Sequence, residues 1–175
     1  MTFESFESGL EKFVDKVRAD QAANFEKAFQ NNTEGIKPRH IPTINEGMAG
    51  QWVNGVKFAR RVFSLDGEKV EGVFPVFKAE FNCRLPENLY TASDSEQMRY
   101  CTKKLAARIE RDPKFASKFS PRQLEQIKNG EPRISGLTWH HNEIPGKMQL
   151  VNAAEHNAAR HTGGRSIWGG GRENR

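Results

Sequence analysis

Residues 134–161 of this chain read ISGLTWHHNEIPGKMQLVNAAEHNAARH, and this stretch decides the fold that we expect. Ile134 to His141 has the composition of a short strand, and Met148 to Val151 has that of a second one. The Pro-Gly pair within Ile144 to Lys147 predicts a turn between these strands. Ala153 to His161 is typical of a helix. The stretch therefore predicts a β-hairpin followed by a helix.

Histidines gather in the same stretch. Four of the five histidines of the chain fall within 22 residues, at His140, His141, His156 and His161. Imidazoles rarely cluster for packing alone, because each buried ring needs a partner and neighbouring rings repel one another when protonated. Rings at a strand end and on the following helix can meet at one point, as a metal ion with imidazole ligands requires. We therefore expect a functional site here, and an ordinary surface role for His40.

The segments before this stretch carry separate signals. Residues 3–29 place apolar side chains at helical spacing and predict an amphipathic helix, whereas residues 31–50 contain two prolines and indicate a linker. Val56 to Leu85, with a turn at Asp66-Gly67, predicts a hairpin or short meander. We expect a helical N-terminal extension over residues 1–50 and a second domain over residues 51–175.

Two further helices have clear start signals. Ser93-Asp94-Ser95-Glu96 is a capping box, and it predicts a helix that ends before Pro113. Ser120-Pro121-Arg122-Gln123 predicts a second helix, for which Gly130 is a suitable end. Only the tail from Gly169 is expected to be disordered. The elements together predict an α+β fold.

Charge and composition limit the partners. Residues 101–175 hold 14 Lys and Arg against 7 Asp and Glu, a balance of +7, whereas residues 1–100 hold 13 against 15, a balance of −2. This asymmetry favours a polyanionic partner on the C-terminal half. The chain has neither a long apolar run nor the order of a signal peptide, so no membrane anchor and no cleaved signal are expected. Cys83 and Cys101 lack CxxC spacing and are expected to be core residues.

Several motifs, taken in order, resemble one known family. The chain resembles the WHH branch of the HNH/endonuclease VII nucleases in five places. These are Gly136 to His141, Pro145 to Val151, His156, His161 to Arg165, and Ile167 to Gly169. The resemblance implies a ββα-metal (His-Me finger) motif at about residues 134–162. Residues 70–130 also resemble the segment that precedes this motif in such proteins. These nucleases occur widely as C-terminal toxin modules of bacterial competition systems.

The resemblance implies a role for each histidine of the cluster. His140 and His156 would hold a divalent metal ion, with His161 as a third ligand or a phosphate contact. His141 would be the general base that activates the attacking water, because imidazole can accept a proton at neutral pH. Trp139 precedes the pair and is expected to face the opposite side of its strand as a core anchor.

The remaining candidate residues are less sharply defined. The Asn that orients the base in the wider family has no unambiguous counterpart here; we choose Gln149, with Asn152 as the alternative. Glu143 can accept a hydrogen bond from a histidine that binds the metal. Three basic residues near the site are expected to contact phosphate, with a solvated surface as the alternative: Lys147, Arg160 and Arg165.

The function implied by the resemblance is hydrolysis of DNA phosphodiester bonds by an endonuclease that uses one divalent ion, Mg²⁺, Mn²⁺, Ni²⁺ or Zn²⁺, and leaves a 5′-phosphate. The toxin context implies delivery from the producing bacterium into the cytoplasm of a target cell, and an acidic immunity protein as a partner. Three alternatives stay open: an RNase of the same fold, a non-catalytic zinc-stabilised module that binds nucleic acid, and a phage or restriction nuclease.

Overall fold

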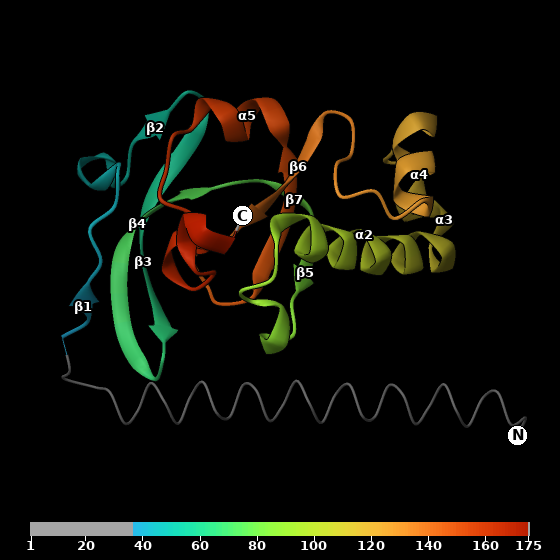
Figure 1. Ribbon diagram of the computed structural model, residues 1–175. Helices are drawn as coiled ribbons and strands as arrows, with labels where there is room; N and C mark the ends of the chain where they lie inside the picture. The colour runs from blue at the N-terminus through green and yellow to red at the C-terminus, as the bar shows by residue number, and fades with distance from the viewer. Residues whose placement is uncertain (1–36, 175) are drawn as a thin grey trace, which may run out of the picture. The chain divides into compact units, whose positions relative to one another are not determined.

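The structure is a computed structural model that describes residues 37–174. The chain divides into two units between Lys37 and Pro38, and the description below concerns the second one. Mixed helices and two sheets confirm the predicted α+β class (Figure 1). The elements are β1 (Arg39–His40), η1 (Glu46–Met48), β2 (Trp52–Val53), β3 (Val56–Leu65), β4 (Glu68–Val76), β5 (Ala79–Arg84), η2 (Glu87–Leu89), α2 (Asp94–Arg111), α3 (Pro113–Ala116), α4 (Pro121–Lys128), β6 (Leu137–His141), β7 (Lys147–Asn152), α5 (Ala153–Ala158), α6 (Gly164–Ile167) and η3 (Gly171–Asn174).

The first sheet, sheet A, is built around the long antiparallel hairpin of β3 and β4. The chain reverses at Asp66 and Gly67, whose φ angles of 50° and 82° lie in the left-handed region. A tight two-residue hairpin turn requires such angles, and Asp-Gly is a favoured pair for them. β1 flanks β4 and β2 flanks β3, which gives the order β1-β4-β3-β2. The predicted hairpin is confirmed in these two strands.

The last strand of the predicted meander belongs to a different sheet. β5 pairs with β7, and β7 pairs with β6, so the second sheet, sheet B, has the order β5-β7-β6. Phe77 and Lys78 lie outside any strand and let the chain cross from sheet A to sheet B. Of the two predicted alternatives, the hairpin is therefore confirmed and the short meander is wrong, because an alternation of apolar residues identifies a strand but not its neighbour.

The two predicted helix starts are confirmed. Ser93 caps α2 and Ser120 caps α4, each in a complete capping box with the third residue of its helix, Glu96 or Gln123. α2 ends at Arg111, before Pro113, as expected. The short helix α3 has no counterpart in the sequence prediction, because Pro113 indicates the end of a helix; at the first position of a helix, however, a proline is favourable.

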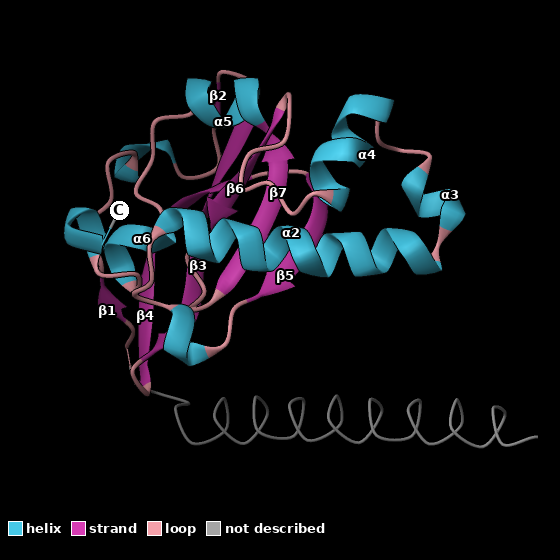
Figure 2. Ribbon diagram, turned by 45° about the vertical axis from the view of Figure 1, so that its right-hand side comes forward, coloured by secondary structure: helices cyan, strands magenta, loops and turns pink. Residues whose placement is uncertain are grey.

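Sheet B lies between sheet A and the helices α2–α4, as both ribbon views show (Figures 1 and 2). One face packs against α2 in a core that contains Trp139 and Leu150, whereas Val151 packs with residues of sheet A. Trp139 is thus confirmed as a core anchor. Cys83 and Cys101 belong to the same core as Trp139 and carry free thiols.

The ends of the described region differ from expectation. The amphipathic helix predicted over residues 3–29 lies outside the described residues. Residues 38–50, assigned to the extension from the sequence, contain β1, which pairs with β4 as part of sheet A. The expectation of a disordered tail is wrong up to Asn174, since η3 forms there and the Asn174 carbonyl accepts a hydrogen bond from Arg165. No helix within residues 37–174 is both long and apolar enough to cross a bilayer.

Candidate metal centre

The hairpin of β6 and β7 positions the paired histidines. Antiparallel register places His140 opposite Gln149 and His141 opposite Met148. Because successive side chains of a strand point to opposite faces, the two imidazoles leave β6 on different sides. His141 shares the side of Trp139, which faces α2, and His140 lies on the other side of sheet B.

The next two histidines come from the segment that follows β7. Asn152 ends β7 and caps α5, because its side-chain oxygen accepts hydrogen bonds from two backbone amides of the first helical turn. α5 carries His156 but ends at Ala158, so His161 comes from the following loop, not from a helix as predicted. The Nδ1 atom of His161 is hydrogen-bonded to the Ala159 carbonyl. A carbonyl only accepts, so Nδ1 carries the proton and Nε2 the lone pair.

Three of the four clustered imidazoles meet at one point. His140, His156 and His161 each offer a ring nitrogen, and these atoms lie within 4.8 Å of one another. The ring centroids are separated by 5.0–5.3 Å. The ring of Phe77 lies against all three, with centroid separations of 4.9–5.5 Å, and forms an apolar wall. A strand, a helix and a loop therefore converge on one small volume.

The chemistry of these side chains fits a divalent metal ion. His140 is 2% exposed, and its buried Nε2 atom has no hydrogen-bond partner among the described residues. A buried nitrogen in this state is costly unless another group, such as a metal ion, satisfies it. Three imidazole ligands leave at least one coordination position open for water or substrate, whereas a structural zinc site is closed by four protein ligands.

All three imidazoles are held in the neutral form that binds a metal. Burial, together with the nearby rings of His161 and His156, lowers the pKa of His140 well below its usual value. Burial and the proximity of His161 lower the pKa of His156 to about 4. Burial also lowers the pKa of His161. Since a metal ion competes with protons for these nitrogens, lowered pKa values favour metal binding at neutral pH.

The same pKa values predict how the stability of the metal-free protein depends on pH. The unfolded chain takes up protons at its histidines as the pH falls through about 6.5, whereas the folded protein resists protonation until lower pH. For His156 the affected interval runs from pH 6.5 down to about 4. As the pH falls through this interval, the free energy of unfolding should decrease by about 1.4 kcal/mol per pH unit for each proton that the unfolded chain binds and the folded protein does not. Thermal melts of metal-free protein at pH 7 and pH 5 measure this. A His156→Leu variant should lose less stability over that interval, and an equal loss in both proteins would contradict the prediction.

His141 lies beside the three converging imidazoles and has its own partners. It is 8% exposed and lines one cleft of about 290 Å³ together with His140, His156 and His161. Its Nε2 atom lies 2.7 Å from the Gln97 side-chain oxygen and 3.8 Å from a carboxylate oxygen of Asp94. The two sides of sheet B thus open into a common cleft.

The predicted supporting residues lie elsewhere. Gln149 accepts a hydrogen bond from Asn142 and donates one to Asn82, and neither bond reaches His141. The alternative, Asn152, is occupied as the cap of α5. Glu143 is buried and pairs with Arg61 at 3.3 Å, not with a histidine of the cluster. None of these three contacts the proposed base or a proposed ligand through a hydrogen bond.

The three residues predicted to contact phosphate differ in how far they are buried. Arg165 is 2% exposed; its guanidinium donates to the carbonyls of Tyr90 and Ala92 and pairs with Asp94 at 3.2 Å. This burial favours a role in holding the loop before α2 over a direct phosphate contact. Lys147 is half-buried, and its positive charge contributes to the low pKa of His140. Arg160 is exposed on the loop after α5 and is available to solvent.

Gly164 and His40 are two further residues whose surroundings are simple to describe. A Cβ atom at Gly164 would overlap the Asn142 carbonyl, so close packing explains why glycine stands there. His40 lies on β1, away from the cluster, and is half-exposed beside Glu46. Its surface role is confirmed.

Sequence reasoning missed three residues that complete the site. Gln97 and Asp94 come from the start of α2, more than 40 positions before His141, and Phe77 comes from the crossing between the sheets. Asp94 and its neighbours read as a helix cap, and Gln97 reads as one polar residue of an amphipathic helix. The burial of Gln97, which is 0% exposed, was the distinguishing feature, and it depends on the tertiary fold.

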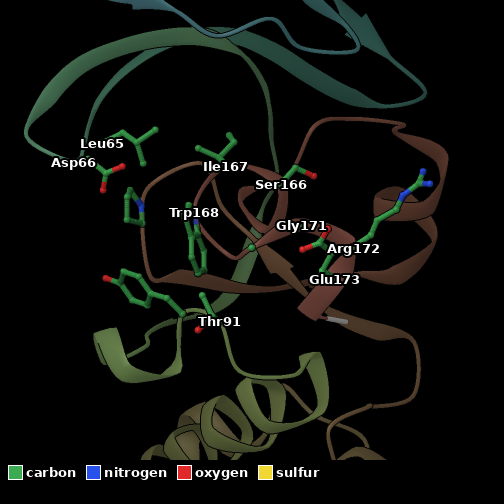
Figure 3. Close-up of a pocket in the computed structure, with 12 residues that line it drawn as sticks. Leu65, Asp66, Thr91, Ser166, Ile167, Trp168, Gly171, Arg172 and Glu173 are labelled. Atoms are coloured by element: carbon green, nitrogen blue, oxygen red, sulfur yellow. The ribbon is translucent and has the colours of Figure 1, made fainter.

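A larger cleft, of about 660 Å³, lies on the other side of Trp168 (Figure 3). Figure 3 shows the Trp168 ring between Leu65 and Thr91, with Ile167 on the same side of the pocket as Leu65. The Trp168 ring lies 5.8 Å from that of His141, so it forms part of the boundary between the two clefts. The larger cleft contains no histidine, and the smaller one is the better candidate for chemistry.

Comparison with known proteins gave one match. A family model described as the DNase/tRNase domain of colicin-like bacteriocins matches residues 66–163, more than half of the chain. These residues include β4 to β7, α2 to α5 and all four histidines of the cluster. No curated protein and no solved structure matched the chain.

Proposed function

Because the chain belongs to the family of DNase/tRNase domains of colicin-like bacteriocins, we propose that it is a metal-dependent endonuclease of the HNH type that hydrolyses DNA. One observation carries the proposal: three neutral imidazoles converge within 4.8 Å, and a fourth imidazole lines the same cleft. Hydrolysis of a phosphodiester by such an enzyme needs a site that binds a cation and a base that removes a proton from the attacking water, and this arrangement supplies both.

Each histidine then has a defined task. His140, His156 and His161 would hold one divalent ion through ring nitrogens. When bound there, the ion supplies a Lewis acid that contacts the scissile phosphate and stabilises the negative charge that develops on the leaving 3′ oxygen. His141 removes a proton from the attacking water, the bond between phosphorus and the 3′ oxygen breaks, and that oxygen takes a proton from solvent. The products carry a 5′-phosphate and a 3′-hydroxyl.

Gln97 fixes which nitrogen of His141 acts as the base. The Gln97 amide nitrogen donates to the carbonyls of Leu89 and Tyr90 at 2.7 and 2.8 Å, so its oxygen is the atom that faces His141. An amide oxygen only accepts, and therefore His141 Nε2 donates and Nδ1 carries the lone pair that receives the proton. The Asp94 carboxylate, 3.8 Å from Nε2, favours the imidazolium that forms.

A Gln97→Leu variant tests this positioning role. Loss of the acceptor should lower kcat by about 10-fold or more, since a misplaced base is a poor proton acceptor, while the KM for DNA changes little. The ¹⁵N shifts of the His141 ring should report the Nε2–H tautomer in the wild type and a mixture in the variant. The role of Gln97 would be contradicted if the Gln97→Leu variant had the same kcat as the wild type. It would also be contradicted if the His141 ring of the wild type carried its proton on Nδ1.

The choice of DNA over RNA is tested with both substrates. Purified protein is incubated with supercoiled plasmid or total RNA, in the presence of Mg²⁺, Mn²⁺, Ni²⁺, Zn²⁺ or a chelator. We expect nicked and linear plasmid with a divalent ion and intact plasmid with the chelator. Cleavage of RNA with plasmid left intact would instead make the chain an RNase. Binding of nucleic acid without cleavage of either would support the zinc-stabilised binding module.

The family also supports a role as the toxic module of an interbacterial toxin. We propose in addition that an acidic immunity protein restrains the module in its producer. Such a module acts in the cytoplasm of the target cell. Expression in the bacterial cytoplasm should therefore stop growth and degrade the chromosome, and His141→Ala should abolish both effects. Normal growth with intact chromosomal DNA would oppose the toxin assignment, and a phage or restriction role would then be preferred.

A further inference from the structure

A third cleft lies between the edge strand β5 and helix α2, outside the histidine centre. Its volume is about 480 Å³. Figure 2 shows α2 running beside β5, in agreement with their direct contact. The residues of the described chain that line it include no acidic side chain. They are Phe81, Asn82, Cys83, Arg84, Tyr100, Lys104, Arg108 and Arg111.

We call this cleft the basic cleft. The helical period of α2 places three of its cationic side chains on one side of the helix. Lys104, Arg108 and Arg111 lie three to four residues apart, so they share one face of α2. All three are exposed, as is Arg84 at the end of β5. Arg108 pairs with Asp112 at 2.7 Å, whereas within residues 37–174 no carboxylate lies at ion-pair distance from Lys104 or Arg111. The charges of these two are therefore available to a partner.

The basic cleft is connected to the histidine centre by further positive charge. Lys147 lies two positions before Gln149 on β7, and Gln149 stands opposite His140, so Lys147 and His140 leave the same face of sheet B. Across the β5–β7 pairing, Lys147 stands directly opposite Arg84, so the two side chains leave the same face of sheet B. Cations thus follow one another from the metal centre, over the sheet edge and along α2. From Lys104 to Arg111 the helix rises about 10 Å, a length that spans roughly three phosphates of one DNA strand.

We propose that the basic cleft binds the sugar-phosphate backbone of the nucleic acid substrate, several nucleotides away from the bond that is cleaved. The proposal rests on the proposed function, because it extends the substrate path from the same centre. The aromatic ring of Tyr100, 5.4 Å below the Lys104 ammonium group, adds a surface on which a sugar or base can pack. Contacts of this kind carry no sequence preference and increase affinity in a salt-dependent way.

The test removes two cations from the cleft and compares the result with removal of two others. The variant is Lys104→Ala with Arg111→Ala; the control, Lys103→Ala with Lys114→Ala, removes the same charge from exposed positions that do not line the cleft. Equilibrium binding of a short fluorescent duplex is measured over a range of salt concentrations, with His141→Ala in every protein to prevent cleavage. The cleft variant should reduce the slope of log K against log salt by about two, and the control by less.

Cleavage kinetics in proteins that retain His141 separate this proposal from the proposed function. The cleft variant should raise the KM for duplex DNA and leave unchanged the hydrolysis of bis(p-nitrophenyl) phosphate, a diester too small to reach the cleft. An unchanged salt slope would overturn the proposal and make an acidic protein the better partner for these charges. Loss of small-diester hydrolysis would overturn it as well, since the substitutions would then act on the centre itself. Failure of the wild type to hydrolyse either substrate would instead overturn the proposed function.

Discussion

His141→Ala is expected to reduce the rate of plasmid cleavage by about 10²–10⁴-fold, the range that a positioned general base contributes. The variant removes the proton acceptor without touching the three converging imidazoles, because His141 leaves β6 on the opposite side from His140. Metal affinity should therefore stay close to that of the wild type. Initial rates of nicking of supercoiled plasmid, with metal titration of the same samples, measure both quantities.

The matched control for this variant is His40→Ala. It removes an imidazole of the same chemistry from an exposed position on β1, and its cleavage rate should equal that of the wild type. Retention of more than a tenth of the wild-type rate by His141→Ala would show that another group activates the water. Loss of metal affinity in this variant would show that His141 is a ligand and not the base.

The second large effect is expected from His156→Ala. The substitution leaves two of the three converging ligands, so metal affinity should fall by more than the roughly 10–100-fold that loss of a supporting group costs in metal sites. Cleavage should be lost at metal concentrations that saturate the wild type and should return in part at a large excess of metal. Calorimetric titration of metal-free protein with Ni²⁺ or Zn²⁺ gives the affinities.

Glu155→Ala is the control for this second prediction, because it alters the neighbouring exposed position of α5 and leaves all three imidazoles. Its metal affinity should match that of the wild type. Equal affinities of His156→Ala and the wild type would mean that the ion binds elsewhere. In that case the convergence of the three rings would have only a packing role.

The elements that the sequence predicted correctly are those with local signals. The capping boxes of Ser93 and Ser120 and the Asp66-Gly67 turn each lie within a few residues of the feature that they determine. The partner of β5 has no such signal, because Arg84 pairs with Lys147, more than 60 positions later. Pairing over that separation depends on how the two sheets and α2 pack, and no short motif encodes it.

The same distinction applies within the site. The histidines of the site are predictable because they are close in sequence and follow a clear order of strand, turn, strand and helix, although His161 lies in the loop after α5. The residues that surround them come from distant segments, such as Gln97 on α2 and Phe77 between the sheets. Arg165 shows the opposite error: its position beside the cluster indicated a surface contact, but the carbonyls of Tyr90 and Ala92 bury its guanidinium.

The most direct test of the account is plasmid cleavage by metal-free protein before and after a divalent ion is added back. If His140, His156 and His161 hold the ion on which hydrolysis depends, chelator-treated protein will leave supercoiled plasmid intact, and added metal will restore nicking. Full cleavage in the presence of chelator would contradict a metal centre at these three histidines.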